Sequence, residues 1–161
     1  MFSTELLGDL LQTNFLGRDV IYKSQTSSTN EDAWNYFYNK SPNGTLVITD
    51  DQQHGRGRRQ NKWFSTKGKS LTFSFILHQE MGLDKLGLIP LLAGVSSACG
   101  IKSITSIQAG LKWPNDIILN GEKMGGILIE SKSIKNVLGV VIGIGLNINE
   151  SITDFPEQLR K

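Results

Sequence analysis

The residues best suited to chemistry lie in a cationic loop, which we define as residues 50–63. It follows an apolar, β-like run at residues 46–48, so we expect it to extend from the end of a strand. Glycine lets successive backbone N–H groups converge on one anion, and arginine adds a planar pair of donors that suits carboxylate or phosphate. The loop supplies both kinds of residue, together with one lysine: Gly55, Arg56, Gly57, Arg58, Arg59 and Lys62. The pattern predicts an anion site, with a solvent-exposed hairpin tip as the alternative.

A second unusual stretch, residues 112–116 with the sequence Lys-Trp-Pro-Asn-Asp, places a lysine, an amide and a carboxylate around a proline. Proline within a β pattern requires a sheet edge or a bulge. The apolar neighbours of Lys112 predict that its ammonium group is partly buried, and a buried cation requires an anionic partner. That partner is either a bound anion or the carboxylate of Asp116, and both interpretations remain open.

A third cation, Lys123, precedes a pair of glycines, and three further glycines interrupt the last β-like run. Glycine inside a strand indicates either a bulge or the close approach of a ligand or a second backbone. These glycines are Gly125 and Gly126 after the lysine, and Gly139, Gly143 and Gly145 in the last run. The sequence leaves both interpretations open.

Several familiar site patterns do not fit this sequence. Gly68-Lys69-Ser70 lacks the earlier glycine of a P-loop, because Trp63 stands at that position. Gly55-Arg56-Gly57 lacks the third glycine of a dinucleotide-binding fingerprint. His54 and His78 have no partner at metal-binding spacing, so no zinc site is predicted.

The elements that must position these residues follow from periodicity and turn signals. Ser27–Asp32 resembles a capping box that opens a helix, and residues 71, 73, 75 and 77 alternate as the core-facing side of a strand. Helical patterns cover residues 5–11, 27–41 and 83–101, β patterns cover 20–22, 45–49, 71–77, 111–119, 126–130 and 137–148, and turns are expected at Asn120-Gly121 and Lys135-Asn136. We therefore expect an α+β fold with a mixed, largely antiparallel sheet and helices on one face.

Composition restricts the class of protein. A chain of 161 residues with 39% hydrophobic and 20% charged residues suits one globular domain. The net charge of +2 disfavours general nucleic-acid binding. The single cysteine, Cys99, excludes an internal disulfide, is expected in the core, and suits a reducing compartment. With no export signal and no uninterrupted apolar span, the sequence predicts a cytoplasmic protein that does not enter a membrane.

These motifs occur together in one order, which is more specific than any of them alone. They are Ser28-Thr29-Asn30, Gln52-Gln53, Gly55 to Arg59, Lys112 to Asp116, Lys123 with Gly125 to Leu128, and Gly143 to Asn147. In this order they resemble the catalytic domain of the biotin protein ligases (biotin-[acetyl-CoA-carboxylase] ligase), which has a class II aminoacyl-tRNA synthetase-like fold. The resemblance implies that biotin and ATP, with Mg²⁺, form biotinyl-5′-AMP. The biotinyl group then passes to a lysine of a biotin carboxyl carrier protein, and the enzyme needs no prosthetic group or metal site of its own.

The resemblance also implies a role for particular residues. Ser28, Thr29 and Gln52 would bind the ureido head of biotin, and Asn30 would help to form that end of the helix. Lys112 and Arg58 would be catalytic, at the point where the biotin carboxylate attacks the α-phosphorus. The implied biotin or biotinyl-AMP set further includes Gly55, Arg56, Gly57, Gly126 and Asn147, and the implied phosphate set is Arg56, Arg58, Lys112 and Lys123.

The sequence departs from the family pattern at two places. Gln60-Asn61 stands where the family has Gly-Arg, which makes the ordering of the loop less certain than biotin recognition.

Residues 1–161 are expected to form a catalytic domain without its C-terminal end and C-terminal β-barrel. The alternatives are a biotin-binding fragment without full activity, and a lipoate-protein ligase or octanoyltransferase. No DNA partner is expected, since no helix-turn-helix precedes the domain. An exposed strand at residues 137–148 is expected to pair with a carrier or, in a homodimer, with a second copy of the chain.

Overall fold

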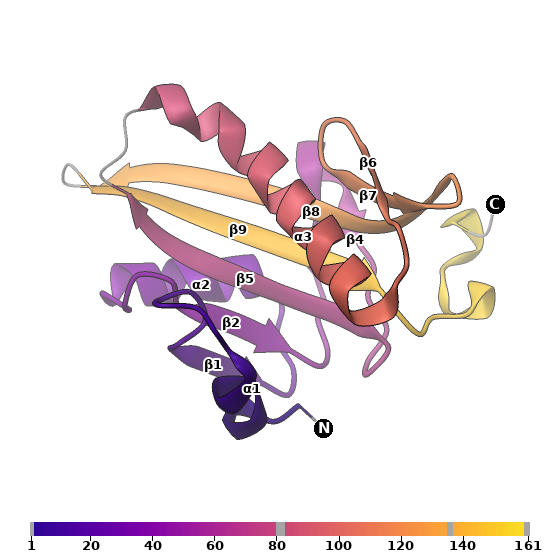
Figure 1. The fold of residues 1–161 in the computed structure, drawn as a ribbon, viewed down its shortest axis with the longest axis horizontal. Helices are drawn as coiled ribbons and strands as arrows, with labels where there is room; N and C mark the ends of the chain where they lie inside the picture. Colours follow the sequence, from indigo (N-terminus) through magenta and orange to yellow (C-terminus); the bar gives the residue numbers. More distant parts are fainter. Residues whose placement is uncertain (1, 80–82, 135–136, 160–161) are drawn as a thin grey trace.

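The computed structural model describes residues 2–79, 83–134 and 137–159 (Figure 1). Its helices are α1 (Thr4–Leu10), α2 (Thr29–Tyr38) and α3 (Ile89–Thr105), with 3-10 turns η1 (Arg58–Gln60), η2 (Leu83–Leu88), η3 (Ile152–Asp154) and η4 (Glu157–Leu159). Its strands are β1 (Val20–Lys23), β2 (Leu46–Thr49), β3 (Gly55–Arg56), β4 (Lys62–Trp63), β5 (Ser70–Gln79), β6 (Gly110–Lys112), β7 (Asp116–Leu119), β8 (Glu122–Ile134) and β9 (Val137–Asn147).

One seven-stranded sheet organises the chain in the order β1-β2-β5-β9-β8-β7-β6. Only β1 and β2 run parallel, and every other neighbouring pair is antiparallel. The predicted α+β class with a mixed, largely antiparallel sheet is therefore confirmed. Strand β9 is hydrogen-bonded to β5 on one side and to β8 on the other. The prediction that this segment offers an exposed strand to a partner was wrong.

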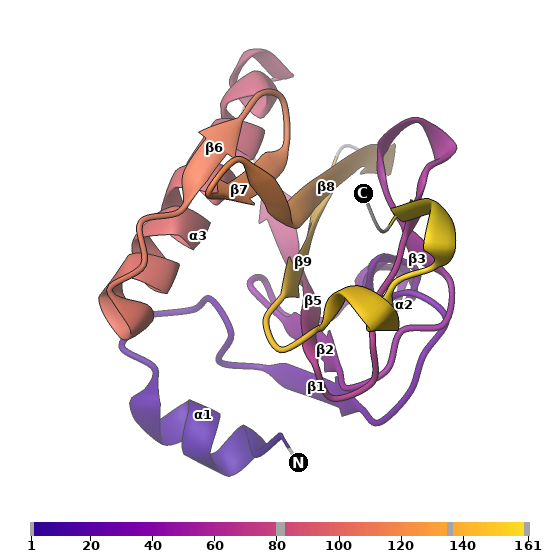
Figure 2. The same ribbon diagram turned by 90° about the vertical axis from the view of Figure 1, so that its right-hand side faces the viewer.

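Helices cover both faces of the sheet, whereas the sequence predicted them on one face. Figure 2, viewed along the sheet, shows α3 on one side and α2 on the other. Ile127 and Ile144 share one core with Ile89 and Ile101 of α3. On the opposite face Ile76 and Val141 pack with Ala33, Trp34 and Phe37 of α2.

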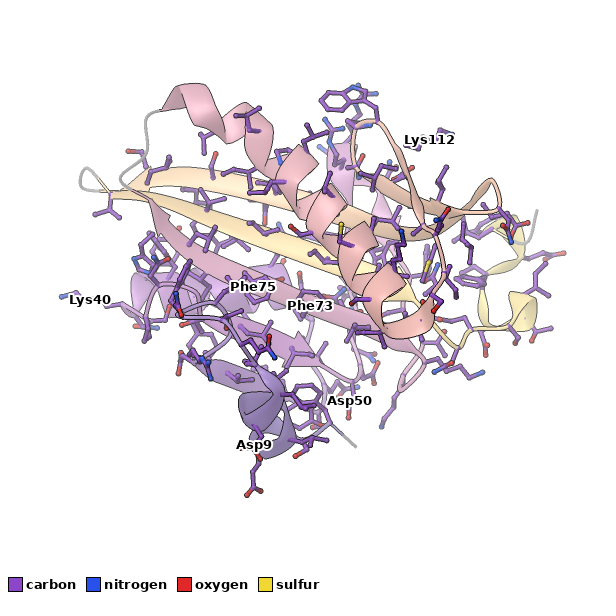
Figure 3. All side chains as sticks on the ribbon, viewed as in Figure 1. Asp9, Lys40, Asp50, Phe73, Phe75 and Lys112 are labelled. Carbon is purple, nitrogen blue, oxygen red and sulfur yellow. The ribbon has the colours of Figure 1, made fainter. Side chains whose placement is uncertain are left out.

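Both faces of β5 are buried, whereas the alternation of its residues predicted only one core-facing side. Phe73 and Leu77 pack against the core beneath α3, as predicted, and Figure 3 labels Phe73 on this strand. The even-numbered side is buried more deeply, with Ser74 and Ile76 fully inaccessible to solvent. The even-numbered residues of β5 include polar ones, and polar residues in an alternating pattern normally indicate a solvent-exposed face. The sequence therefore predicted one buried face where the structure has two.

The α3 region largely follows its prediction. A 3-10 turn, η2, precedes the α-helix, and Pro90 occupies its first turn, where its missing N–H costs no hydrogen bond. Cys99 is exposed, so its predicted place in the core was wrong. The stretch Leu86–Thr105 is apolar and long enough to cross a membrane by length and composition alone, a test that core helices of soluble proteins also pass. In the structure, Ile89 and Ile101 pack on the sheet.

Turns elsewhere differ in detail. Asn120-Gly121 forms the expected hairpin between β7 and β8, with positive φ at both residues. The β pattern at 111–119 contains an unpredicted turn, so that β6 and β7 form a hairpin at the sheet edge. The predicted turn at Lys135-Asn136 lies outside the described residues.

A short C-terminal segment is tied to the start of β5. Lys69 donates to Asp154 at 2.7 and 2.8 Å, Ser70 donates to Glu150, and Ser151 and Asp154 form a capping box around η3. The Lys69 ammonium and the N–H and hydroxyl of Ser151 lower the pKa of Asp154 to about 2, from an ordinary value of 3.8. The carboxylate is thus stabilised more in the folded state than in the unfolded chain.

We expect Asp154→Asn to lower the thermal midpoint at pH 6 and to have little effect near pH 2. Because the pKa of Asp154 is lower in the folded state than in the unfolded chain, its carboxylate stabilises the fold fully above about pH 4. This contribution is lost as the pH falls toward 2. Thermal unfolding of both proteins between pH 2 and 7 measures the difference, with Glu157→Gln, at an exposed acid of η4, as the control. A difference that persists unchanged at pH 2 would contradict the assignment.

Candidate functional site

A cleft of about 310 Å³ lies on the α2 face of the sheet, beneath the cationic loop. Its wall is the start of α2, its floor is formed by β5, β8 and β9, and its rim is formed by the loop and the turn after β6. The lining residues are Ser28, Thr29, Asn30, Gln52, Arg56 to Arg59, Asn61 to Trp63, Thr72, Pro114 to Asp116, Lys123, Gly126 to Leu128 and Gly143 to Gly145. Most of the predicted site residues are therefore brought together. The exceptions are Gly55, Lys112 and Asn147, which lie outside this lining.

One end of the cleft is a buried polar network at the start of α2. The Thr29 N–H and hydroxyl donate to Gln52 Oε1 at 2.9 and 3.2 Å. Ser74 Oγ lies 2.8 Å from Thr29 Oγ1 and 2.7 Å from Asn30 Oδ1. The predicted capping box is not formed, because the Ser28 side chain makes no capping bond among the described residues. Gln52 satisfies that helix end instead, which leaves the Ser28 hydroxyl beside the cleft.

We expect Gln52→Ala to lower the free energy of unfolding by about 1–3 kcal/mol, because the buried Thr29 N–H loses its acceptor. Gln52→Glu is the matched control, since it keeps an acceptor oxygen and places negative charge at a helix N-terminus. Urea unfolding of the three proteins measures the effect. Equal losses in both variants would show that Gln52 contributes by packing rather than by accepting this bond.

The glycines of β9 allow other side chains to approach the strand backbone closely. The sequence left open whether these glycines mark a bulge or a close approach, and the structure shows the close approach. A Cβ on Gly143 would lie 2.0 Å from Asn30 Oδ1, and one on Gly145 would lie 2.5 Å from the Trp63 ring. The same holds at Gly139, where the Phe37 ring approaches to 2.5 Å. Gly126 differs, because a Cβ there would meet only ordinary contacts of 3.4–3.6 Å. The floor of the cleft is thus flat because α2 and Trp63 rest directly on the strand backbone.

Lys123 and the loop residue Lys62 line the cleft, whereas Lys112 does not. Lys123 Nζ forms an ion pair with Asp116 at 2.7 Å and lies 5.9 Å from the centre of the Trp63 ring. Lys112 is exposed on the β6 edge strand and is not among the lining residues, although its strand partner Asp116 is. The prediction that Lys112 is part-buried was wrong. The alternative ion pair with Asp116 is also wrong, because Asp116 pairs with Lys123.

The cationic loop contains a small hairpin of β3 and β4, and the tip of this hairpin lines the cleft. Arg58 Nη1 lies 3.5 Å from Asn115 Oδ1 across the rim. Asn115 is itself held to β8, because its N–H₂ donates to the Ile127 carbonyl and its own carbonyl accepts the Ile127 N–H. The cations in the lining of the predicted anion site are Arg56, Arg58, Arg59 and Lys62 from the loop and Lys123 from β8.

The loop tip holds non-glycine residues in a left-handed conformation. Arg59 has φ 54° and Gln60 has φ 65°. Gln60 is one of the positions at which the sequence departs from the family pattern of Gly-Arg. A left-handed conformation costs a residue with a side chain about 1–2 kcal/mol, whereas glycine adopts it freely.

We expect Gln60→Gly to stabilise the protein by about 0.5–1 kcal/mol, after the greater freedom of glycine in the unfolded chain is subtracted. Asn61→Gly is the matched control, because Asn61 has φ −64° and gains no relief from glycine. It should destabilise by a similar amount. Urea unfolding gives both values, and a loss of stability in Gln60→Gly would contradict the strain.

Three residues in or beside the cleft were not singled out from the sequence: Trp63, Thr72 and Ser74. Trp63 Nε1, Thr72 Oγ1 and Asn147 Oδ1 are buried without a hydrogen-bond partner among the described residues. The polar residues on the even side of β5 were the available signal. Polar side chains facing a helix within an otherwise apolar strand indicate a functional surface.

Comparison with known proteins agrees with this geometry. The model of the biotin/lipoate A/B protein ligase family matches residues 22–147. The bifunctional ligase/repressor BirA of Bacillus spizizenii is 41% identical over 151 residues, which cover 93% of this chain and 46% of that protein. Chloroplastic biotin–protein ligase 1 of Arabidopsis thaliana is 34% identical, with 92% and 41% covered. The chain thus spans about half the length of these curated relatives.

Solved structures give the same result. The biotin protein ligase of Aquifex aeolicus in complex with biotin and ATP superposes with a TM-score of 0.75 at 33% identity, covering 89% of this chain and 57% of that one. The Leishmania major biotin protein ligase in complex with biotinyl-5-AMP gives 0.72 at 26% identity, with 83% and 58% covered. This chain belongs to the biotin/lipoate A/B protein ligase family.

Proposed function

We propose that this chain carries out the ATP-dependent activation of biotin to biotinyl-5′-AMP and the transfer of biotin to one lysine of a biotin carboxyl carrier protein. One observation carries the proposal. A single cleft joins a buried network of hydroxyl and amide groups at one end to Arg58 and Lys123 at the other. A ureido ring with both donors and an acceptor suits the first end, and a carboxylate meeting a phosphate suits the second.

The chemistry needs no nucleophile from the protein. A carboxylate oxygen of biotin attacks the α-phosphorus of ATP, the bond to the β-phosphate oxygen breaks, and pyrophosphate leaves. The acceptor lysine amine then attacks the acyl carbon, loses a proton, and displaces AMP. Lys123 and Arg58 would stabilise the charge that develops on phosphorus oxygens in both steps.

Mg²⁺ belongs to the proposal as a companion of ATP. The described residues contain no group of three or more His, Cys, Asp and Glu side chains arranged to hold a metal ion. Mg²⁺ in such enzymes is bound chiefly by substrate phosphates with one or two carboxylates, and Asp116 is the carboxylate at the rim. Its role would be to neutralise the phosphates.

A lipoate-protein ligase or octanoyltransferase activity is the second candidate, because the family includes both classes of enzyme. The polar network favours biotin, since an aliphatic chain would offer no partner to the Ser28 hydroxyl beside the cleft. Titration calorimetry with biotin and with lipoate separates the two. Tighter binding of lipoate would overturn our preference.

The test of the full function is incubation with radiolabelled biotin, MgATP and a carrier domain, with adenylate and transferred biotin measured separately. Both products support the proposal. Adenylate without transfer supports an activating domain that needs the remaining half of its relatives, and biotin binding alone supports a binding fragment. Absence of biotin binding overturns it. We further propose a cytoplasmic location, as suits the single exposed cysteine.

A further inference from the structure

One carboxylate, that of Glu130 on β8, ties together three segments that are far apart in the sequence. Its Oε2 accepts hydrogen bonds from Asn30 Nδ2 at 2.9 Å, from Trp34 Nε1 at 3.3 Å and from Arg56 Nη2 at 2.9 Å. Two of these donors belong to α2, and the third belongs to the cationic loop. Glu130 lies outside the lining of the cleft and has no part in the roles argued above.

The two sides of this contact differ in rigidity. Asn30 and Trp34 are each 4% exposed and packed beneath the sheet, so Glu130 is fixed on the α2 side. The Arg56 side chain is 38% exposed and belongs to a two-stranded hairpin that is separate from the main sheet. Trp63, at the base of this hairpin, already rests on β9, so the tip at residues 57–62 is the part that the bond to Glu130 would join to a rigid part of the fold.

The environment of Arg56 also argues against a role in holding phosphate. Its Nη2 is bonded to Glu130, and its Nε lies 3.7 Å from Glu31. A guanidinium between two carboxylates has much of its charge neutralised. Arg58, by contrast, faces the amide oxygen of Asn115 and keeps its charge for a ligand.

We propose that Glu130 is a positioning residue that holds the cationic loop closed through Arg56, so that Arg56 serves as a tether and Arg58 as the anion ligand. The expected effect on the release of adenylate rests on the proposed function, whereas the expected effect on the ordering of the loop does not. Because the pair is partly exposed, dissolved salt weakens it and should open the loop.

Hydrogen exchange of the ligand-free protein tests the tether without any activity. Glu130→Gln keeps an oxygen to accept from Asn30 and Trp34 but loses the charge that holds Arg56. We expect exchange of residues 57–62 to rise about fivefold or more, while α2 exchanges as in the wild type. Glu31→Gln is the matched control, because it removes the same charge at the longer distance of 3.7 Å, and it should change exchange less than twofold.

A second variant covers the case in which Glu130→Gln loosens α2 or fails to fold. Arg56→Gln breaks the same tether from the exposed side and leaves the bonds of Asn30 and Trp34 in place. It should raise loop exchange by the same factor. Loop exchange at the wild-type rate in Arg56→Gln overturns the proposal, as does an equal effect of Glu130→Gln and Glu31→Gln.

Kinetic measurements give a second test, whose result would not change if Glu130 only supported the fold. Raising salt from 50 to 500 mM should speed release of the adenylate from the wild type and from Glu31→Gln. In Glu130→Gln, release should be about tenfold faster at low salt and should depend less on salt than in the wild type, because only the attraction of the remaining cations for the phosphate is still screened, with kcat for adenylation changed less than threefold. Unchanged salt dependence in Glu130→Gln overturns the kinetic part. If the wild type forms no adenylate, the proposed function fails while the exchange result still decides the tether.

Discussion

Replacing Lys123 with alanine is expected to slow adenylate formation by about a hundredfold or more. Lys123 Nζ lies at the rim of the cleft, held by Asp116 at 2.7 Å, where the charge on the attacked phosphate would develop. Loss of one preorganised donor to a transition state commonly costs about 3–4 kcal/mol. Single-turnover formation of labelled biotinyl-AMP measures the rate.

Lys112→Ala is the matched control for this experiment, because it removes an identical side chain from the exposed edge strand. Its rate should stay within about threefold of the wild type. A hundredfold loss in Lys112→Ala with little loss in Lys123→Ala would restore the assignment expected from the sequence.

The second large effect is expected in Arg58→Gly. Arg58 reaches across the rim to Asn115, and its loss removes a cation from the anion site and a contact that closes the loop. We expect release of biotinyl-AMP to accelerate by about tenfold to a hundredfold, since a charged hydrogen bond to phosphate is lost. The released anhydride should then acylate exposed lysines of bystander proteins.

Rapid filtration of the enzyme–adenylate complex measures this release, and biotin blotting of added albumin measures the bystander reaction. Lys67→Ala is the control, because Lys67 is an exposed cation that follows the loop and does not line the cleft. If Arg58→Gly retained the intermediate as the wild type does, the loop would have no role as a lid.

Local patterns were sufficient for much of the fold. Asn120-Gly121 specified its hairpin because positive φ at both residues is easy for this pair. Apolar runs marked β2, β5, β8 and β9. Which face a helix covers is not a local property, and α2 and α3 were therefore placed on one face in error.

The same reasoning holds for the glycines of the site. Gly143 and Gly145 indicated either a bulge or a close approach, and no residue near them in the sequence could decide between the two. The partners, Asn30 and Trp63, belong to other elements, and only packing brings them against the strand.

The sequence by itself determined the family, the cationic loop and the polar start of α2, because each is carried by residues close together in the chain. Only the tertiary structure decided that Lys123 lines the cleft while Lys112 does not, and that Arg56 is bonded to Glu130. Lys112 and Lys123 belong to β6 and β8, the two neighbours of β7, and the turn after β6 and the bulge between Ile117 and Ile118 set their register. A shift of one residue turns a side chain to the other face of a sheet, so this choice depends on strand pairing. The contact between Glu130 and Arg56 joins residues 74 positions apart, and it too exists only in the folded chain.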